Sequence, residues 1–374
     1  MGFTKLLHEG EDSVELFVIC YLVMCTCVRI LDFRTFPKGK GGTILGKIRS
    51  RTPLSRRDEV LLELAMNNGG FPSCKTTNLY QESRNPHILM AQLTQMSAST
   101  TKTFTLNSGK LIPAIGLGVY KSAPGEETYE AVLSALLAGY RHIDTAQIYR
   151  NESDVGRALE DSPVPRSEVF VTTKLWLGNW GYDKAKDAVN QSLKELRTSY
   201  IDLILLHAPG DVATRDETWK ALEDLQSEGK LMSIGVSNFG IPHLQKLEKS
   251  ARVTPAVNQI EVHPWNQRVE LVKFCNDHGI IVEAYSPLAK AIKLSDPTVC
   301  RVATKYECTP AQVLISWGLL KGLVSLPKSV NPMRQKQNLD SSDAANLSDD
   351  DVVLLDSLEE YLVTGWDPVL DAEV

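Results

Sequence analysis

A carboxylate and a phenol, Asp144 and Tyr149, stand five residues apart where a short apolar segment gives way to a polar one. Their side chains can converge on one pocket only if the backbone turns sharply between them, and the Thr-Ala-Gln that follows Asp144 permits such a turn. A phenol held near a cation can act as a general acid. The pair therefore predicts a pocket to which other parts of the chain supply a cation and a source of hydride.

Short apolar runs, each ending in polar residues and mostly followed by helical spacing, recur after residue 114. Eight of them are predicted strands: 115–118, 142–144, 169–174, 201–207, 233–238, 257–261, 280–285 and 324–328. Helices are predicted over 183–196 and 218–226, and further helices begin at Thr309-Pro310 and at Ser348. Before the strands, 104–106 and 111–113 flank turn residues and predict an N-terminal β-hairpin.

Eight strands alternating with helices over ~250 residues predict an α/β protein of the (β/α)8 or TIM-barrel type. A doubly wound sheet is the alternative, and it would normally show a glycine-rich phosphate fingerprint at its first strand–helix turn. Gly116 and Gly118 are not followed by a third glycine in register, so we interpret them as packing residues. The barrel is therefore the favoured fold.

A barrel of this type has its chemistry at the carboxyl ends of its strands. Asp144 ends the second predicted strand, Lys174 the third and His207 the fourth. Lys174 can pair with Asp144, and its cation is expected to lower the pKa of the Tyr149 phenol toward that of a useful proton donor. His207 can hydrogen-bond a carbonyl oxygen and orient it. Each residue alone is more often structural, but together they predict carbonyl protonation while a cofactor delivers hydride.

Polar and aromatic side chains that could hold a nicotinamide and its carboxamide follow the later strands: Ser237, Asn238, Gln259 and Tyr285. Lys328, Ser329 and Arg334 lie on a strand end and a helix start, where a phosphate finds both cations and unpaired backbone N–H groups. Each of these residues also has an ordinary structural interpretation, as a packing residue, a turn or a solvated cation.

Residues 103–368 resemble the aldo-keto reductase superfamily. The motifs that carry the resemblance occur in the family's order and at compatible spacing: GYRHIDTAQIYRNE, VTTKLW, DLILLH, GVSNF, NQIEVHP, AYSPL and LPKSVNPMR. The resemblance implies a (β/α)8 fold and NADPH-dependent reduction of aldehydes and ketones to alcohols, reversible with NADP. It also implies that Tyr149 is the proton donor and that Asp144, Lys174 and His207 complete a catalytic tetrad.

The same resemblance assigns the remaining site residues. It implies nicotinamide contacts from Ser237, Asn238, Gln259 and Tyr285, pyrophosphate contacts from Ser286 and Leu288, 2'-phosphate contacts from Lys328, Ser329 and Arg334, adenine contacts from Gln337 and Asn338, and a substrate pocket lined by Tyr120, Trp176 and His207. The two cations favour NADPH over NADH, because only NADPH brings a phosphate dianion there. A short Ala-Pro-Gly sequence follows His207, as in the short-loop, diketogluconate-reductase-like branch, and it predicts an open pocket.

Composition narrows the possible partners. A net charge of -6 argues against sequence-independent nucleic-acid binding, which draws on a basic surface. Seven cysteines without paired spacing fit a reducing, cytoplasmic compartment, and Cys25 with Cys27 has no second pair to complete a metal site. We therefore expect a cytoplasmic monomer or weak dimer that acts on a small-molecule carbonyl compound and uses no metal.

Residues 1–101 are unlike the rest and are predicted to be a poorly ordered extension, with the barrel domain over 102–374. The apolar run at 16–28 falls short of the ~20 residues of a spanning helix, and the acidic residues before it do not suit a signal peptide. A membrane anchor remains the alternative, because basic residues follow the run.

Two other functions compete with reduction: a nucleotide-sensing regulatory module, and a barrel lyase or isomerase acting on phosphorylated sugars.

Overall fold

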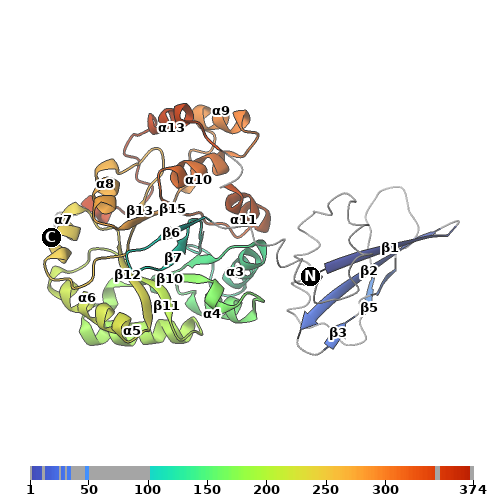
Figure 1. Cartoon of the computed structure of the whole chain (residues 1–374), viewed down its shortest axis with the longest axis horizontal. Helices are drawn as coiled ribbons and strands as arrows, with labels where there is room; N and C mark the ends of the chain where they lie inside the picture. The colour runs from blue at the N-terminus through green and yellow to red at the C-terminus, as the bar shows by residue number, and fades with distance from the viewer. Residues whose placement is uncertain are drawn as a thin grey trace. The chain divides into compact units, whose positions relative to one another are not determined.

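The computed structural model describes residues 102–341 and 346–370 with their side chains, and the backbone of five strand segments within residues 2–49. The chain divides into two compact units, Met1–Ala98 and Ser99–Val374. Figure 1 shows the strands and helices of both units.

The first unit contains five strands: β1 (Gly2–Gly10), β2 (Ser13–Met24), β3 (Cys27–Arg29), β4 (Asp32–Arg34) and β5 (Lys47–Arg49). Antiparallel pairing joins β1 to β2, β2 to β3 and β4 to β5. The apolar run at 16–28 thus falls largely on β2 and β3, while Cys25 and residues 50–101 lie outside the described residues. Within the part of the chain that the structure describes, no helix is long and apolar enough to cross a membrane.

The second unit is built on eight parallel strands, which confirms the predicted barrel. They are β8 (Leu117–Gly118), β9 (His142–Asp144), β10 (Phe170–Leu175), β11 (Ile201–Leu206), β12 (Leu231–Ser237), β13 (Val257–Glu261), β14 (Ile281–Tyr285) and β15 (Val324–Leu326). Each strand pairs with the next in chain order. Parallel bridges from Ile115 to Ser325 and from Gly118 to Lys328 join the last strand to the first, so that the sheet closes on itself.

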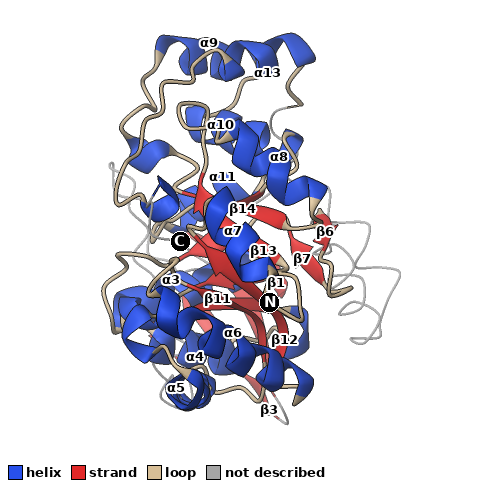
Figure 2. Ribbon diagram, turned by 90° about the vertical axis from the view of Figure 1, so that its left-hand side faces the viewer, coloured by secondary structure: helices blue, strands red, loops and turns tan. Residues whose placement is uncertain are grey.

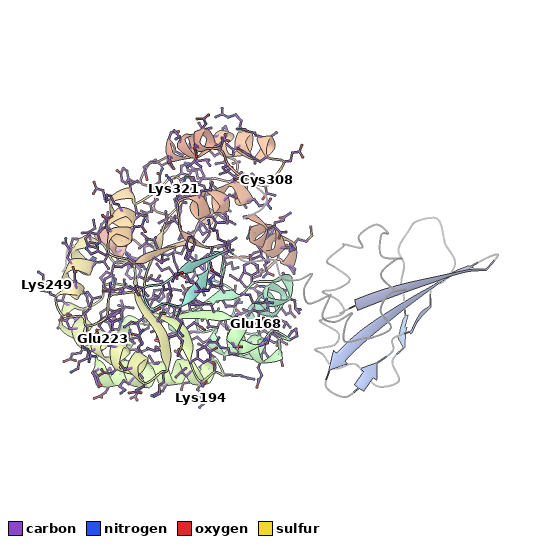
Figure 3. The ribbon with its side chains drawn as sticks, viewed as in Figure 1. Glu168, Lys194, Glu223, Lys249, Cys308 and Lys321 are labelled. Atoms are coloured by element: carbon purple, nitrogen blue, oxygen red, sulfur yellow. The ribbon has the colours of Figure 1, made fainter. Side chains whose placement is uncertain are left out.

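Helices follow the strands and surround them, as Figure 2 shows in blue around red. They are α3 (Glu126–Ala138), α4 (Glu152–Asp161), α5 (Tyr182–Glu195), α6 (Val212–Ser227), α7 (Ile241–Glu248), α8 (Val269–Asp277), α9 (Pro297–Lys305), α10 (Pro310–Leu320), α11 (Pro332–Leu339) and α13 (Asp349–Asp356). Charged side chains such as Lys194 and Lys249 point away from the barrel (Figure 3). The sheet is therefore shielded from water on its outer face.

Local sequence explains where helices begin. Thr309 caps α10 in a capping box with Gln312, and Pro310 fills the first turn, where its missing N–H leaves no hydrogen bond unmade. Ser348 caps α13 by accepting a hydrogen bond from the backbone N–H of Asp351. Both predicted helix starts are confirmed.

The predicted hairpin is also confirmed, as β6 (Thr103–Thr105) and β7 (Leu111–Pro113). Leu106 and Ile112 from this hairpin join the buried cluster that strand residues such as Leu203, Val257 and Leu326 contribute. Asn107 in the hairpin's turn donates to the carbonyls of Thr254 and Pro255 just before β13, so the hairpin lies at the amino ends of the strands and leaves their carboxyl ends available for a site.

Candidate active site

Lys174 of β10 lies at the centre of a buried polar cluster. Its side chain is 1% exposed, and its Nζ is 2.7 Å from both carboxylate oxygens of Asp144 on the neighbouring strand β9. The same ammonium donates to the carbonyl oxygen of Thr145 at 2.9 Å and lies 3.4 Å from the hydroxyl of Tyr149. The structure thus brings together the carboxylate, the cation and the phenol that the sequence singled out.

A tight turn carries the phenol back toward Lys174. After Asp144 the chain enters the 3-10 helix η1 (Gln147–Tyr149), and Arg150 then adopts a left-handed backbone with φ 57°. The side chain of Asn151 fixes this turn, because its Oδ1 accepts from the Thr145 hydroxyl at 2.8 Å and its Nδ2 donates to the carbonyl of Val119 at 3.2 Å. The sharp turn that convergence required is therefore present.

The environment of Tyr149 corrects one expectation about its acidity. Burial raises the pKa of the phenol more than the Lys174 cation lowers it, so the net shift is upward and not downward as predicted from the lysine alone. The sequence shows which cation is near but not how dry the site is. A phenol with a raised pKa stays protonated at neutral pH, which is the state that a proton donor requires.

His207 lies just beyond β11 and forms one wall of the site. Burial, and then the charge of Lys174, lower the pKa of its imidazole to about 3, so the ring is neutral at physiological pH. Its Nδ1 has no hydrogen-bond partner among the described residues. The ring lies edge-on to Tyr149 at 5.8 Å and to Trp176 at 5.2 Å between centroids, and Tyr120 packs 5.1 Å from Tyr149. The predicted pocket residues therefore surround the phenol.

The residues expected around a nicotinamide and its carboxamide lie on three neighbouring strands: Ser237 and Asn238 at the end of β12, Gln259 within β13 and Tyr285 at the end of β14. The amide of Asn238 donates to the carbonyl of His207 at 3.0 Å and accepts from the Tyr285 hydroxyl at 2.9 Å. The amide nitrogen of Gln259 donates to Asp144 at 2.8 Å. Asn238 and Gln259 are thus hydrogen-bonded directly to His207 and Asp144, two members of the predicted tetrad.

The predicted phosphate residues lie at the end of β15 and the start of α11. Lys328 and Arg334 are exposed, and neither forms an ion pair with a side chain that the structure describes. Asn331 caps α11 by accepting from the backbone N–H of Arg334, and the Ser329 hydroxyl accepts from the backbone N–H of Asn331. Two available cations beside a helix N-terminus make a donor set that fits a phosphate dianion.

The other predicted cofactor residues follow the same two segments. Ser286 has a left-handed backbone with φ 49° and, like Leu288, lies between β14 and the 3-10 helix η4 (Ala289–Ala291). Gln337 is exposed on α11, whereas Asn338 is buried on the same helix. Only part of this set is therefore accessible to an adenine ring.

Sequence reasoning missed the residue that connects the phenol's turn to the pocket wall. Gln147 accepts hydrogen bonds from the backbone N–H of Trp176 at 3.0 Å and from the Asn179 amide at 2.8 Å, and it donates to the Ser192 hydroxyl. These partners are 29 to 45 residues away, so no local pattern could have indicated them. A second missed residue, Glu283, was visible as a carboxylate inside the otherwise apolar run of β14.

Comparisons with known proteins identify the family of the chain. The family model described as "Aldo/keto reductase family" matches residues 114–360. Glyoxal reductase of Bacillus subtilis is 41% identical over 73% of this chain and 98% of its own length, and the NADP(+)-dependent glycerol 2-dehydrogenase of Saccharomyces cerevisiae is 44% identical over 64% and 86%. The structure of a Bombyx mori aldo-keto reductase in complex with NADP superposes with a TM-score of 0.67, at 35% identity over 71% of this chain and 94% of that one. The chain therefore belongs to the aldo-keto reductase family, whose members are oxidoreductases that use a nicotinamide cofactor.

Proposed function

We propose that this protein reduces aldehyde or ketone groups to alcohols, with NADPH as hydride donor and Tyr149 as proton donor. The observation that carries the proposal is the contact of the buried Lys174 ammonium with both Asp144 and the Tyr149 hydroxyl. This arrangement lacks a strong nucleophile, but it can give a proton to a carbonyl oxygen and stabilise the phenolate that remains.

The side chains around the site fit NADPH. Ser237, Asn238, Gln259 and Tyr285 would hold the nicotinamide, Ser286 and Leu288 the pyrophosphate, Lys328, Ser329 and Arg334 the 2'-phosphate, and Gln337 and Asn338 the adenine. When bound, the nicotinamide supplies the hydride. NADP occurs in the name of the Saccharomyces cerevisiae relative and in the Bombyx mori structure, and this supports NADPH as the cofactor.

The chain's own residues would each perform one task on a carbonyl substrate. Tyr120 and Trp176 flank it, and the neutral imidazole of His207 donates a hydrogen bond to its oxygen and orients it. Tyr149 gives the proton, while Asp144 holds Lys174 in place to stabilise the phenolate. Microscopic reversal of these steps oxidises an alcohol.

The proposal is tested by NADPH consumption against a panel of aldehydes, dicarbonyls, ketones, keto acids and sugars, with the alcohol product identified. Turnover of any of them supports the proposal. Tight NADPH binding without turnover across the panel would instead favour a nucleotide-sensing module, and phosphate binding without NADPH binding would favour a lyase or isomerase.

A form that starts at Met96 tests whether the N-terminal extension contributes to activity, since we expect its activity to match that of the full chain. The size-exclusion elution of that form tests the expected monomer or weak dimer.

Cofactor preference provides a sharper prediction. Arg334→Met should raise the KM for NADPH by about 10- to 100-fold, the effect of losing a hydrogen bond to a charged group worth about 1.5–3 kcal/mol. The KM for NADH should stay within about twofold, because NADH lacks the 2'-phosphate. Lys336→Met on the same helix is the matched control, since Lys336 pairs with Asp340. An equal rise for both cofactors would contradict the assignment of Arg334.

A further inference from the structure

Two buried carboxylates share one amide beneath the proposed active site. Glu283 of β14 is fully buried, and its Oε2 accepts a hydrogen bond from the side-chain nitrogen of Gln259 at 2.8 Å. The same nitrogen donates to Asp144 at 2.8 Å. Strand register creates this arrangement, because Gln259 lies directly opposite Glu283 in the pairing of β13 with β14. Both N–H groups of the amide are therefore used by carboxyl oxygens.

Among the described residues around Glu283, one cation is present. Lys174 of β10 is that cation, and its ammonium is bound to both oxygens of Asp144. His142 of β9 cannot serve as a second one, because burial lowers the pKa of its imidazole to about 3. On the other neighbouring strand, β15, the residue that pairs with Glu283 is Val324, which carries no charge. An ionised Glu283 would thus be a second buried negative charge without a partner, which is strongly unfavourable.

The contacts of the other carboxyl oxygen agree with a neutral acid. Glu283 Oε1 has no hydrogen-bond partner within the described residues, and His142 Nε2 is the ring nitrogen facing it at 3.6 Å. The imidazole Nδ1 lies 3.3 Å from the carbonyl of Pro113, which makes Nδ1 the donor, and the unprotonated Nε2 accepts from the hydroxyl of Thr172 at 3.0 Å. His142 therefore has no N–H that it could donate to an ionised Oε1. Burial, and then the charge of Asp144, raise the pKa of Glu283 to about 8.

A glycine, Gly116, leaves space for the His142 ring beside Glu283. A Cβ on Gly116 would lie 2.7 Å from His142 Nδ1 and 2.7 Å from Leu326 Cδ2, so any other residue would displace the imidazole. Gly116 is thus a packing residue, as predicted, because the absence of a Cβ leaves space for the His142 ring beside Glu283.

We propose that Glu283 is a positioning residue, a neutral carboxylic acid that acts through the shared amide of Gln259 to fix Asp144 and so hold Lys174 beside Tyr149. Its effect on turnover rests on the proposed function. Because both N–H groups of Gln259 are engaged, the carbonyl oxygen of this amide remains to accept from a carboxamide N–H. Glu283 would then help to align both the proton donor and the nicotinamide.

Two neutral variants of Glu283 test its hydrogen bond with Gln259. Glu283→Gln keeps the size, neutrality and hydrogen-bond acceptor of the protonated acid, so its kcat and its Kd for NADPH should stay within about threefold of the wild type. Glu283→Leu removes the acceptor and frees one N–H of Gln259; kcat should fall by about tenfold or more and the Kd for NADPH should rise. Equal activity of the wild type and Glu283→Leu would overturn the positioning role.

Infrared spectroscopy reads the protonation state without turnover. At neutral pH the wild type should show the carbonyl stretch of a protonated carboxylic acid that is missing from Glu283→Gln. Glu261→Gln is the control: burial alone would raise the pKa of Glu261, but hydrogen bonds from His263 and Thr364 hold it below its ordinary value. That substitution should remove no such band. Absence of a band specific to Glu283 would overturn the neutral acid.

Unfolding against pH gives an independent readout. Folding raises the pKa of Glu283, so the stability that its proton contributes is fully present below the ordinary glutamate value of about 4.3 and is lost as pH rises through about 8. Across this window the wild-type unfolding constant should gain up to about tenfold per pH unit relative to Glu283→Gln. Identical pH dependence of unfolding in the wild type and Glu283→Gln would contradict the proposal.

If the wild type reduced no carbonyl compound, the proposed function would fail, while the infrared and unfolding measurements would still decide the protonation state of Glu283.

Discussion

Replacement of Tyr149 by Phe should lower kcat for carbonyl reduction by about 10²- to 10⁴-fold, the usual contribution of a positioned general acid. The substitution removes only the hydroxyl that lies 3.4 Å from Lys174 Nζ. The ring contacts with Tyr120 and His207 remain, because a phenylalanine ring packs as the phenol does. The Kd for NADPH, measured by quenching of tryptophan fluorescence, should therefore change little.

A matched substitution on the same pocket wall serves as the control. Tyr120 is half exposed and packs against Tyr149 through its ring, which Tyr120→Phe keeps, so this variant should hold kcat within about threefold of the wild type. Full activity of Tyr149→Phe toward a reactive aldehyde would show that the proton comes from elsewhere.

The raised pKa of Tyr149 also fixes the direction of the pH dependence. Burial keeps the phenol protonated beyond its ordinary value of about 10, so the rate of reduction should stay level through neutral pH and fall only in strongly alkaline solution. Residual turnover by Tyr149→Phe should lack this alkaline limb. A limb that persisted in the variant would have to be assigned to another group.

The strand ends could be predicted from the sequence because a closed parallel barrel requires apolar runs that stop where the loops begin. Asp144 and Lys174 were located in this way, and the pairing of β9 with β10 brings their side chains together. Glu283 was not predicted as a site residue, since its role depends on Gln259 and Asp144, which lie 24 and 139 residues away in the chain. Local pattern thus predicts the strands, but not which buried polar groups share a hydrogen bond.

The sequence also did not show how deeply the site residues are buried. The position of Lys174 predicted a lowered pKa for Tyr149, whereas the desolvation of the phenol reverses the net direction. Burial, together with the charge of Lys174, also makes the imidazole of His207 neutral. The residues of the site could therefore be identified from the sequence, while their protonation states required the packed structure.

Replacement of Lys174 by Met should abolish detectable reduction and also destabilise the fold by about 3–5 kcal/mol, the typical effect of removing one partner of a buried ion pair. Lys174 is 1% exposed and its ammonium satisfies both oxygens of Asp144, so its loss leaves a buried carboxylate whose remaining side-chain hydrogen bond, among the described residues, comes from Gln259. Urea unfolding of Lys174→Met measures the loss of stability.

The double variant Lys174→Met with Asp144→Asn separates catalysis from stability. Asparagine removes the uncompensated charge, so the double variant should recover most of the lost free energy of unfolding while remaining inactive. A double variant that stayed as unstable as Lys174→Met would show that the ion pair is not the source of the loss. Recovery of activity with stability would mean that Lys174 acts only through the fold, and that the Tyr149 phenolate needs no cation beside it.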